Sequence, residues 1–159
     1  MFWDSKKVIG IDIGSSSIKM AELDVGSRGA SLLSFGFAPT PANSISDGSI
    51  SDVGAVAAAI RNLYEDIKPG RKNAAVGLWG LAVIVKKITT GKITDPKLLR
   101  EQAQHEAVQY IPFDPSTISI DYHVLKSSTS PETMDMLLVA AQNELINQYF
   151  QTLDMAGLK

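Results

Sequence analysis

A short segment near the amino terminus combines the residue types that bind phosphate. Residues 8–19 read Val-Ile-Gly-Ile-Asp-Ile-Gly-Ser-Ser-Ser-Ile-Lys, an apolar strand followed by a Gly-Ser turn and a second strand. Small residues let backbone N–H groups approach anionic oxygens, while Lys19 supplies a positive charge and Asp12 can hold a hydrated Mg²⁺. The alternative is a tight β-hairpin whose serines only cap turns, with Asp12 as a solvated edge residue.

The composition is that of a globular protein without a basic face. The 159 residues fit one ordinary domain or two small, interlocked ones, and the hydrophobic share of 45% is enough for a core. The net charge of −2 argues against nucleic-acid binding, which needs a basic surface. The absence of cysteine excludes a disulfide framework and a thiolate metal site, and two histidines far apart in sequence disfavour zinc. We expect a cytoplasmic protein.

The sequence has no membrane-spanning pattern. No apolar run approaches the roughly 20 residues that cross a bilayer. Residues 1–7 carry Phe2 and Trp3 ahead of two lysines, and a strand follows where a signal peptide would have its apolar core. We expect this segment to be a short flap packed on the domain.

The first part of the chain predicts an antiparallel meander. Strands are expected over residues 8–13, 17–24 and 30–38. A Gly-Ser-Arg-Gly turn joins the second strand to the third. Period-two spacing places Leu33, Phe35 and Phe37 on one face of the third strand.

A helix and a fourth strand follow a polar loop. The loop over 39–52 ends in Ser51 and Asp52, either of which can cap a helix. Apolar residues with the spacing i, i+3, i+4, i+7 then predict a helix over 53–67, which a Lys-Pro-Gly sequence stops. A strand over 74–79 comes next, and a strand–helix–strand passage of this length suits a right-handed parallel crossover.

The next passage has the order strand, helix, strand, strand. Its strands are expected over residues 82–89, 118–124 and 133–141. Its helix begins at Asp95-Pro96, an N-cap followed by proline at the first helical position, and ends before Pro112. The passage has about 60 residues, which is small enough for an insertion in a larger domain.

A last helix is expected over 143–156. Its apolar side is expected to contain Leu145, Ile146, Tyr149, Phe150 and Leu153. Gly157 stands where a left-handed C-cap belongs, and Leu158 can make the accompanying hydrophobic contact. We place this helix against the first sheet, because the inserted unit offers it no obvious surface to cover.

Several stretches together resemble one known family. The segment 8–19 is similar to the first phosphate loop of actin-like ATPases. Five further stretches point to one family within this superfamily. The most distinctive is Glu-Ala-Val-Gln-Tyr-Ile-Pro-Phe-Asp at 106–114, and the others are residues 47–52, 83–88, 121–125 and 156–158. With these stretches, essentially the whole chain resembles PilM, the actin-like family of type IV pilus assembly. The division protein FtsA is the nearest structural cousin.

The resemblance implies an α/β fold of the actin-like ATPase (ribonuclease H-like) kind. Residues 1–80 and 142–159 would form an incomplete subdomain 1A, and residues 81–141 an inserted 1C subdomain, the strand–helix–strand–strand (SHS2) unit. Complete members continue for roughly as long again, on the scale of one further domain. We therefore expect an N-terminal fragment that lacks the second lobe and the last strand of 1A.

The resemblance also implies one wall of an ATP site. The matching residues are Asp12, Gly14, Ser15, Ser16, Ser17 and Lys19. Asp12 would bind Mg²⁺ directly or through water, the glycine and serines would donate to the β- and γ-phosphates, and Lys19 would add a charge. Hydrolysis needs a positioned water and both walls of the cleft. We assign no catalytic residue and expect no measurable turnover from this fragment, whereas a complete relative would bind ATP and hydrolyse it slowly.

Protein partners are a second implication. Members of the family recruit the cytoplasmic N-terminal peptide of an inner-membrane protein, PilN, into a groove between the first domain and the insertion, where strand addition or apolar pockets can hold it. Candidate groove residues are Trp79, Leu81 and Tyr110, although plain core or interface packing is the favoured interpretation of Trp79. Contacts with other pilus assembly proteins and self-association are also implied, at the cytoplasmic face of the inner membrane.

Two other functions stay open. An FtsA-type division protein or a secretion-system component would act as an interaction module. A small-molecule kinase of the same superfamily shares the Asp-x-Gly start. The kinase would need a catalytic aspartate at the end of the fourth strand, where this chain has Leu78-Trp79-Gly80, and it would lack the inserted unit.

Overall fold

The computed structural model describes residues 8–27, 29–126 and 130–159, so the expected flap over 1–7 lies outside the described residues. The chain forms two compact units. The first contains residues 1–80 and 147–159, and the second contains residues 81–146. These bounds lie near those expected for the two subdomains, whose assignment as 1A and 1C stays a prediction.

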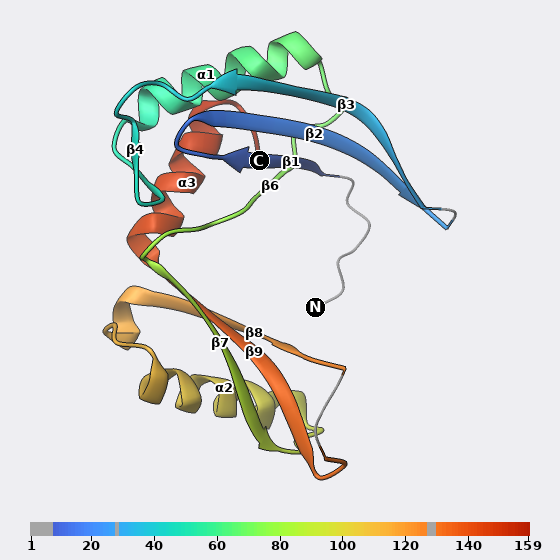
Figure 1. The fold of residues 1–159 in the computed structure, drawn as a ribbon, viewed down its shortest axis with the longest axis vertical. Helices are drawn as coiled ribbons and strands as arrows, with labels where there is room; N and C mark the ends of the chain where they lie inside the picture. The colour runs from blue at the N-terminus through green and yellow to red at the C-terminus, as the bar shows by residue number, and fades with distance from the viewer. Residues whose placement is uncertain (1–7, 28, 127–129) are drawn as a thin grey trace. The chain divides into compact units, whose positions relative to one another are not determined.

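The first unit contains a four-stranded sheet in the order β3-β2-β1-β6. Its strands are β1 (Ile9–Ile13), β2 (Ser17–Gly26), β3 (Gly29–Pro39) and β6 (Ala74–Val76). The first three strands pair antiparallel, as the meander predicted, and β6 pairs parallel to β1 (Figure 1). The expected strand over 74–79 is shorter than predicted, because the chain leaves the sheet after Val76 and enters a segment with glycine at both ends.

A small hairpin occupies the expected loop between the meander and the first helix. β4 (Ile45–Ser46) and β5 (Ser49–Ile50) pair across a turn in which Asp47 and Gly48 both have positive φ. Asp-Gly is a strong signal for such a two-residue turn, because both positions need the left-handed region. The prediction of a plain loop over 39–52 was therefore wrong.

Helix α1 (Val53–Ile67) has the predicted bounds. The Asp52 side chain accepts a hydrogen bond from the Ala55 N–H at 2.9 Å, which confirms Asp52 as the N-cap. The helix runs along β3 (Figure 1), and a Cβ added to Gly36 would collide with the Ile67 and Leu63 side chains. Gly36 therefore lets helix and strand approach closely.

The two faces of the first sheet differ sharply in exposure. One face buries Ile9, Ile11, Ile13, Ile18 and Met20. Leu33, Phe35 and Phe37 project from β3 with 55%, 55% and 70% of their surface exposed. These three side chains share one face of β3, as the period-two spacing predicted, but that face is turned away from the core.

The second unit contains a three-stranded antiparallel sheet in the order β7-β9-β8. Its elements are β7 (Val83–Gly91), α2 (Pro96–Tyr110), the short 3-10 turn η1 (Pro115–Thr117), β8 (Ile118–Val124) and β9 (Thr133–Gln142). The strand–helix–strand–strand order agrees with the prediction. Asp95 caps α2, accepting from the Lys97 N–H at 2.7 Å, and Pro96 is the first helical residue.

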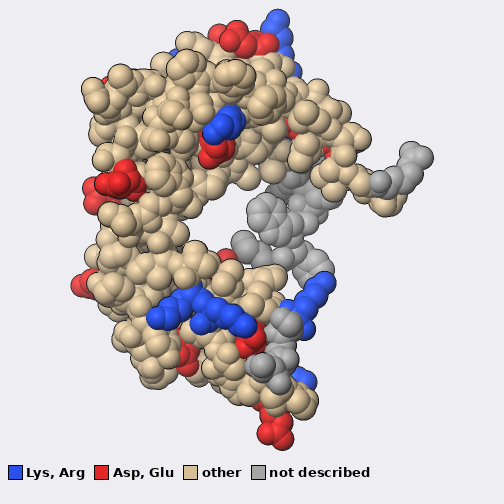
Figure 2. All heavy atoms as spheres, in the orientation of Figure 1, with Lys and Arg blue, Asp and Glu red and all other residues tan. Residues whose placement is uncertain are grey.

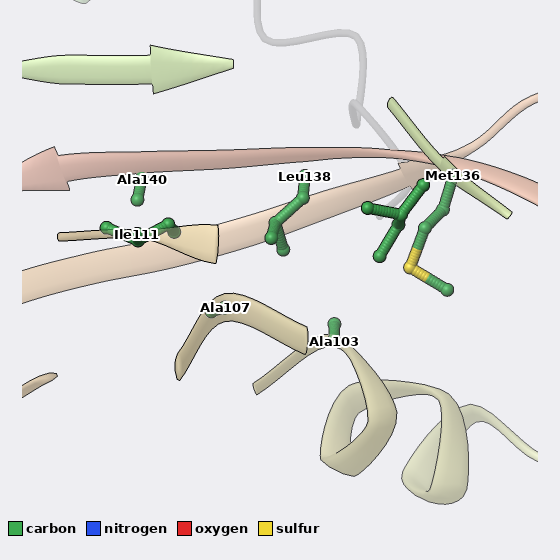
Figure 3. Packing of buried hydrophobic residues seen from close by; sticks show 7 residues of the cluster. Ala103, Ala107, Ile111, Met136, Leu138 and Ala140 are labelled. Carbon is green, nitrogen blue, oxygen red and sulfur yellow. The ribbon is translucent and has the colours of Figure 1, made fainter. Parts of the chain in front are cut away.

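The core of this unit lies between α2 and β9. Met136, Leu138 and Ala140 point from β9 toward Ala103 and Ala107 of α2 (Figure 3). The two alanines let the helix lie close to the strand, so that larger side chains from the sheet fill the space. This packing fixes which face of the sheet is covered.

Helix α3 (Asn143–Met155) begins in the second unit and ends in the first. Gly157 has φ +82°, and the Leu158 N–H donates to the Leu153 carbonyl at 2.9 Å, as the predicted C-cap requires. Phe150 is 67% exposed, so its expected place on the apolar side was wrong. The buried stripe instead runs through Leu145, Tyr149 and Leu153, at intervals of four.

The end of the chain lies beside β6. The Lys159 N–H donates to the Lys72 carbonyl at 2.8 Å, and the Lys159 carbonyl accepts from the Ala74 N–H at 2.6 Å. These two bonds have the pattern of parallel strand pairing, and they return the segment after α3 to the first sheet. Among the helices in the described parts of the chain, none is both long and apolar enough to span a membrane.

Candidate phosphate-binding loop

The predicted phosphate loop connects β1 to β2. β1 ends at Ile13 and β2 begins at Ser17, which leaves residues 14–16 to make the connection. The Gly14 N–H donates to the Ser17 carbonyl at 3.0 Å, and a Cβ at Gly14 would lie 3.0 Å from that same oxygen. A side chain at position 14 would therefore crowd the turn, which explains the glycine.

Asp12 and Lys19 lie beside this loop on neighbouring strands. They are directly opposed in the β1–β2 register, and Lys19 Nζ lies 2.8 Å from Asp12 Oδ2. Both side chains are substantially exposed. The structure thus brings together the six residues predicted for phosphate and metal binding, because one hairpin carries them all.

Two residues outside the hairpin fasten the loop. The Thr40 hydroxyl donates to the Gly14 carbonyl at 2.6 Å, and the Thr40 N–H donates to the Ser16 carbonyl at 3.1 Å. The Trp79 indole N–H donates to the Ile13 carbonyl at 3.0 Å. Sequence reasoning missed Thr40. Thr40 could have been found from its place in the meander, because it directly follows Pro39, and Pro39 lies opposite Ser17 in the strand register.

The backbone polarity of the loop favours an anion. The carbonyls of Ile13, Gly14 and Ser16 accept the bonds described above, so these negative dipole ends are occupied. The N–H groups of Ser15 and Ser16 have no hydrogen-bond partner among the described residues, and both residues are exposed. Free N–H groups in a turn between bonded carbonyls form the kind of concavity that binds phosphate.

The donor set is compatible with Mg²⁺ held partly by water. Asp12 provides the carboxylate oxygens that Mg²⁺ prefers, and one of these oxygens is bonded to Lys19. The described residues contain no group of three or more His, Cys, Asp or Glu side chains placed to hold a metal ion. A protein-only metal cage is therefore not formed by these residues, whereas an ion shared with a bound phosphate fits them.

A shallow apolar hollow adjoins the ion pair on the uncovered face of the first sheet. It has a volume of about 290 Å³ and is lined by small residues of β1, β2 and β6 together with Phe35, Asp12 and Lys19. The small lining residues are Gly10, Ala21 and Ala75. The absence of larger side chains at these positions creates the hollow.

Tyr149 of α3 lies in the core of the first unit. It is 2% exposed, and its hydroxyl donates to the Gly48 carbonyl at 3.0 Å. Burial raises the pKa of the Tyr149 hydroxyl above its ordinary value, and the negative charge of Asp12 adds to the increase.

The three predicted partner-binding residues belong to different units. Trp79 is 38% exposed and is bonded to the phosphate loop of the first unit, while Leu81 is 81% exposed in the second. The ring of Tyr110 is covered by Lys86, whose Nζ lies 4.8 Å from the ring centre. Binding of a partner by these residues stays a prediction.

Lys and Arg side chains gather on the face of the second unit seen in Figure 2. A separate polar cluster in this unit consists of Asp135, Lys87 and Thr89. Asp135 is 3% exposed, and it bonds Lys87 Nζ at 2.8 Å and the Thr89 hydroxyl at 2.7 Å. These bonds hold the pKa of the Asp135 carboxyl below its ordinary value, with Lys87 as the main cause. Because every partner belongs to the same sheet, this cluster is structural.

Comparison with known proteins identifies the family. The family model described as type IV pilus assembly protein PilM matches residues 10–159. A solved structure described as a PilM-PilN type IV pilus biogenesis complex matches with a TM-score of 0.84 and 27% identity. The match covers 96% of this chain but only 45% of that one, so this chain spans less than half the length of its solved relative. The chain thus belongs to the PilM family of type IV pilus assembly proteins, as its resemblance predicted.

Proposed function

We propose that this chain forms the N-terminal part of an actin-fold pilus assembly component that holds the phosphates of ATP in the loop between β1 and β2. The main support is the arrangement of the backbone groups in this loop. Its carbonyls are hydrogen-bonded, whereas the N–H groups of Ser15 and Ser16 have no partner among the described residues, and the Asp12–Lys19 pair lies beside them. In this proposal the first unit corresponds to subdomain 1A and the second to the inserted 1C subdomain.

Each group around the loop has a distinct role. The N–H groups and hydroxyls of Ser15, Ser16 and Ser17, with the Gly14 backbone, donate to phosphate oxygens. Lys19 supplies positive charge, and Asp12 holds Mg²⁺ directly or through water. A bound Mg²⁺ neutralises phosphate charge. A phosphate oxygen bound by Lys19 would replace the bond to Asp12 and would leave the Asp12 carboxylate available to the ion.

Binding by this chain alone should be weak. Nucleotide pockets bury most of their ligand, whereas this loop is an exposed turn at one end of a sheet. Hydrolysis additionally needs a positioned water. We therefore propose nucleotide binding without turnover in residues 1–159, and a complete site only where a longer protein supplies the opposite wall.

Equilibrium binding of Mg·ATP tests the nucleotide role. Lys19→Ala and Asp12→Asn should each weaken binding, while the matched surface change Lys92→Ala should leave it unchanged. Circular dichroism and thermal unfolding verify that each variant is folded. If Lys19→Ala and Asp12→Asn both bound Mg·ATP with wild-type affinity, the proposal would be contradicted.

We further propose that the protein binds the N-terminal peptide of a PilN-like inner-membrane partner from the cytoplasmic side, as a peripheral protein. The support is the similarity to a chain solved in a PilM-PilN complex. Tyr110→Ala and Leu81→Ser should weaken binding of such a peptide. Val108→Ala provides a control on the same helix as Tyr110, because Val108 is also an exposed apolar residue, at 64%. Equal peptide affinity in all variants would exclude the predicted groove residues.

A further inference from the structure

We propose that Trp79 and Thr40 are positioning residues that preset the backbone of the phosphate-binding loop. This inference rests on the proposed phosphate-binding role of that loop. Trp79 fastens the carbonyl of Ile13, where the loop begins, and Thr40 fastens the carbonyls of Gly14 and Ser16 within it. The two residues come from positions 24 to 66 residues away from their partners along the chain.

The end of each peptide dipole that faces the loop's concavity decides whether an anion is attracted or repelled. A carbonyl oxygen that turned toward a phosphate would repel it, whereas an N–H group attracts it. Rotation of a peptide unit exchanges the two groups. Bonds from Trp79 and Thr40 resist that rotation at the 13–14, 14–15 and 16–17 peptide units. The second of these units carries the Ser15 N–H, which therefore stays available before any ligand arrives, and the unit that carries the Ser16 N–H lies between two held units. Such preorganisation lowers the ordering cost of binding.

The backbone around Trp79 is itself held firmly. Gly48 and Gly80 cross so closely that a Cβ on Gly48 would overlap the Trp79 carbonyl, and a Cβ on Gly80 would overlap the Asp47 carbonyl. The buried Tyr149 hydroxyl bonds the Gly48 carbonyl at 3.0 Å. The indole of Trp79 therefore extends from a constrained backbone, as a positioning group should.

Trp79 lies one residue before the end of the first unit. Gly80, the next residue, is the last of the first unit before the chain enters the second. The residue that fastens the loop thus adjoins the covalent connection between the units. A change in the loop on phosphate binding is expected to alter the environment of this indole.

The test uses variants that remove single donors. Trp79→Phe keeps an aromatic ring but removes the N–H, and Thr40→Val keeps the shape but removes the hydroxyl. Thr117→Val is the matched control, because the Thr117 hydroxyl also donates to a backbone carbonyl, that of Asp114 at 2.8 Å, in the second unit. Since one hydrogen bond contributes about 0.5–1.5 kcal/mol, each loop variant should bind Mg·ATP about two- to tenfold more weakly, and the control should not.

A spectroscopic signal separates positioning from general stability. In a Trp3→Phe background the chain has a single indole, and its ¹H–¹⁵N resonance should shift when Mg·ATP is added to that protein. In the absence of nucleotide, the Gly14 amide, which bonds the Ser17 carbonyl, should exchange with solvent faster in Trp79→Phe and Thr40→Val than in the wild type or Thr117→Val.

The outcomes distinguish this inference from the proposed function. If the wild type binds Mg·ATP and both loop variants bind it equally well, the positioning roles are wrong and the nucleotide role stands. If the wild type binds no Mg·ATP, the nucleotide role fails for this chain, and the exchange of Gly14 decides the positioning roles. Unchanged exchange in both loop variants would overturn them.

Discussion

Asp12 and Lys19 are directly opposed on β1 and β2, and their side chains meet across the hairpin at 2.8 Å. Their partnership depends on the register, because a one-residue slip would turn one of them to the opposite face of the sheet. The buried residues Ile11, Ile13 and Met20 hold this register from the other face. Core packing therefore places a charged pair beside the loop between β1 and β2.

Exchanging the two charges should separate stability from phosphate binding. Each single change, Asp12→Asn or Lys19→Ala, should alter the free energy of unfolding by less than about 1 kcal/mol, because exposed ion pairs contribute little. The double variant Asp12→Lys, Lys19→Asp keeps an ion pair but exchanges the carboxylate with the ammonium. It should unfold like the wild type in urea and lose affinity for Mg·ATP. Wild-type affinity in the exchanged variant would argue against the assigned roles.

Alanine at the glycine crossing should destabilise the first unit. Gly48 and Gly80 have φ values of +86° and +106°, and a Cβ on either would overlap a backbone carbonyl. Strained backbone and overpacking each cost about 1–3 kcal/mol, so Gly48→Ala and Gly80→Ala should lower stability by at least that amount. Gly77→Ala is the control, because a Cβ there would meet open space. Urea unfolding measures the difference, and equal stability of the three variants would contradict the observed crossing.

Truncation in the core of the second unit should be far more costly than truncation on its surface. Leu138 is 1% exposed between β9 and α2, and Leu138→Ala should destabilise the protein by about 2–5 kcal/mol because it leaves a cavity. Leu98→Ala removes the same atoms from a side chain that is 54% exposed. The control should therefore show a much smaller loss. Chemical unfolding followed by circular dichroism compares the two, and a similar loss in both would place the core elsewhere.

Acid should weaken the second unit through Asp135. Lys87 and Thr89 hold the pKa of this carboxyl below its ordinary value of 3.8. A carboxyl with a depressed folded-state pKa contributes stability that is complete above the ordinary pKa and is lost as the pH falls through the folded-state pKa. Asp135→Asn should thus lower stability at neutral pH and flatten the decline of stability below about pH 4.

The control for that experiment is Asp121→Asn. Asp121 lies on β8, on the same sheet face as Asp135, but it is exposed. Thermal unfolding as a function of pH should show the wild-type acid profile in this control. If Asp135→Asn also retained that profile, the Lys87 and Thr89 bonds would not be the origin of the acid sensitivity.

Local signals in the sequence determined most of the elements. The caps of α1 and α2 at Asp52 and Asp95, and the left-handed Gly157 after α3, were predicted because capping depends on residues within a few positions. The composition of residues 12–19 was enough to place the candidate phosphate-binding residues on one hairpin, because that hairpin is also local. The Asp47-Gly48 turn was equally local, and it was missed because the surrounding segment was taken for a plain loop.

Only the tertiary structure decided how these elements meet. Phe150 and the β3 side chains Leu33, Phe35 and Phe37 are exposed because the faces of an element are buried or left open by what packs against them. Likewise, Trp79 meets the Ile13 carbonyl across 66 residues of chain. That contact depends on the parallel pairing of β1 with β6 and on the glycine crossing at the end of the first unit. The sequence by itself therefore predicted candidate residues for phosphate binding on one local hairpin, whereas long-range packing decided which residues hold the loop of that hairpin in place.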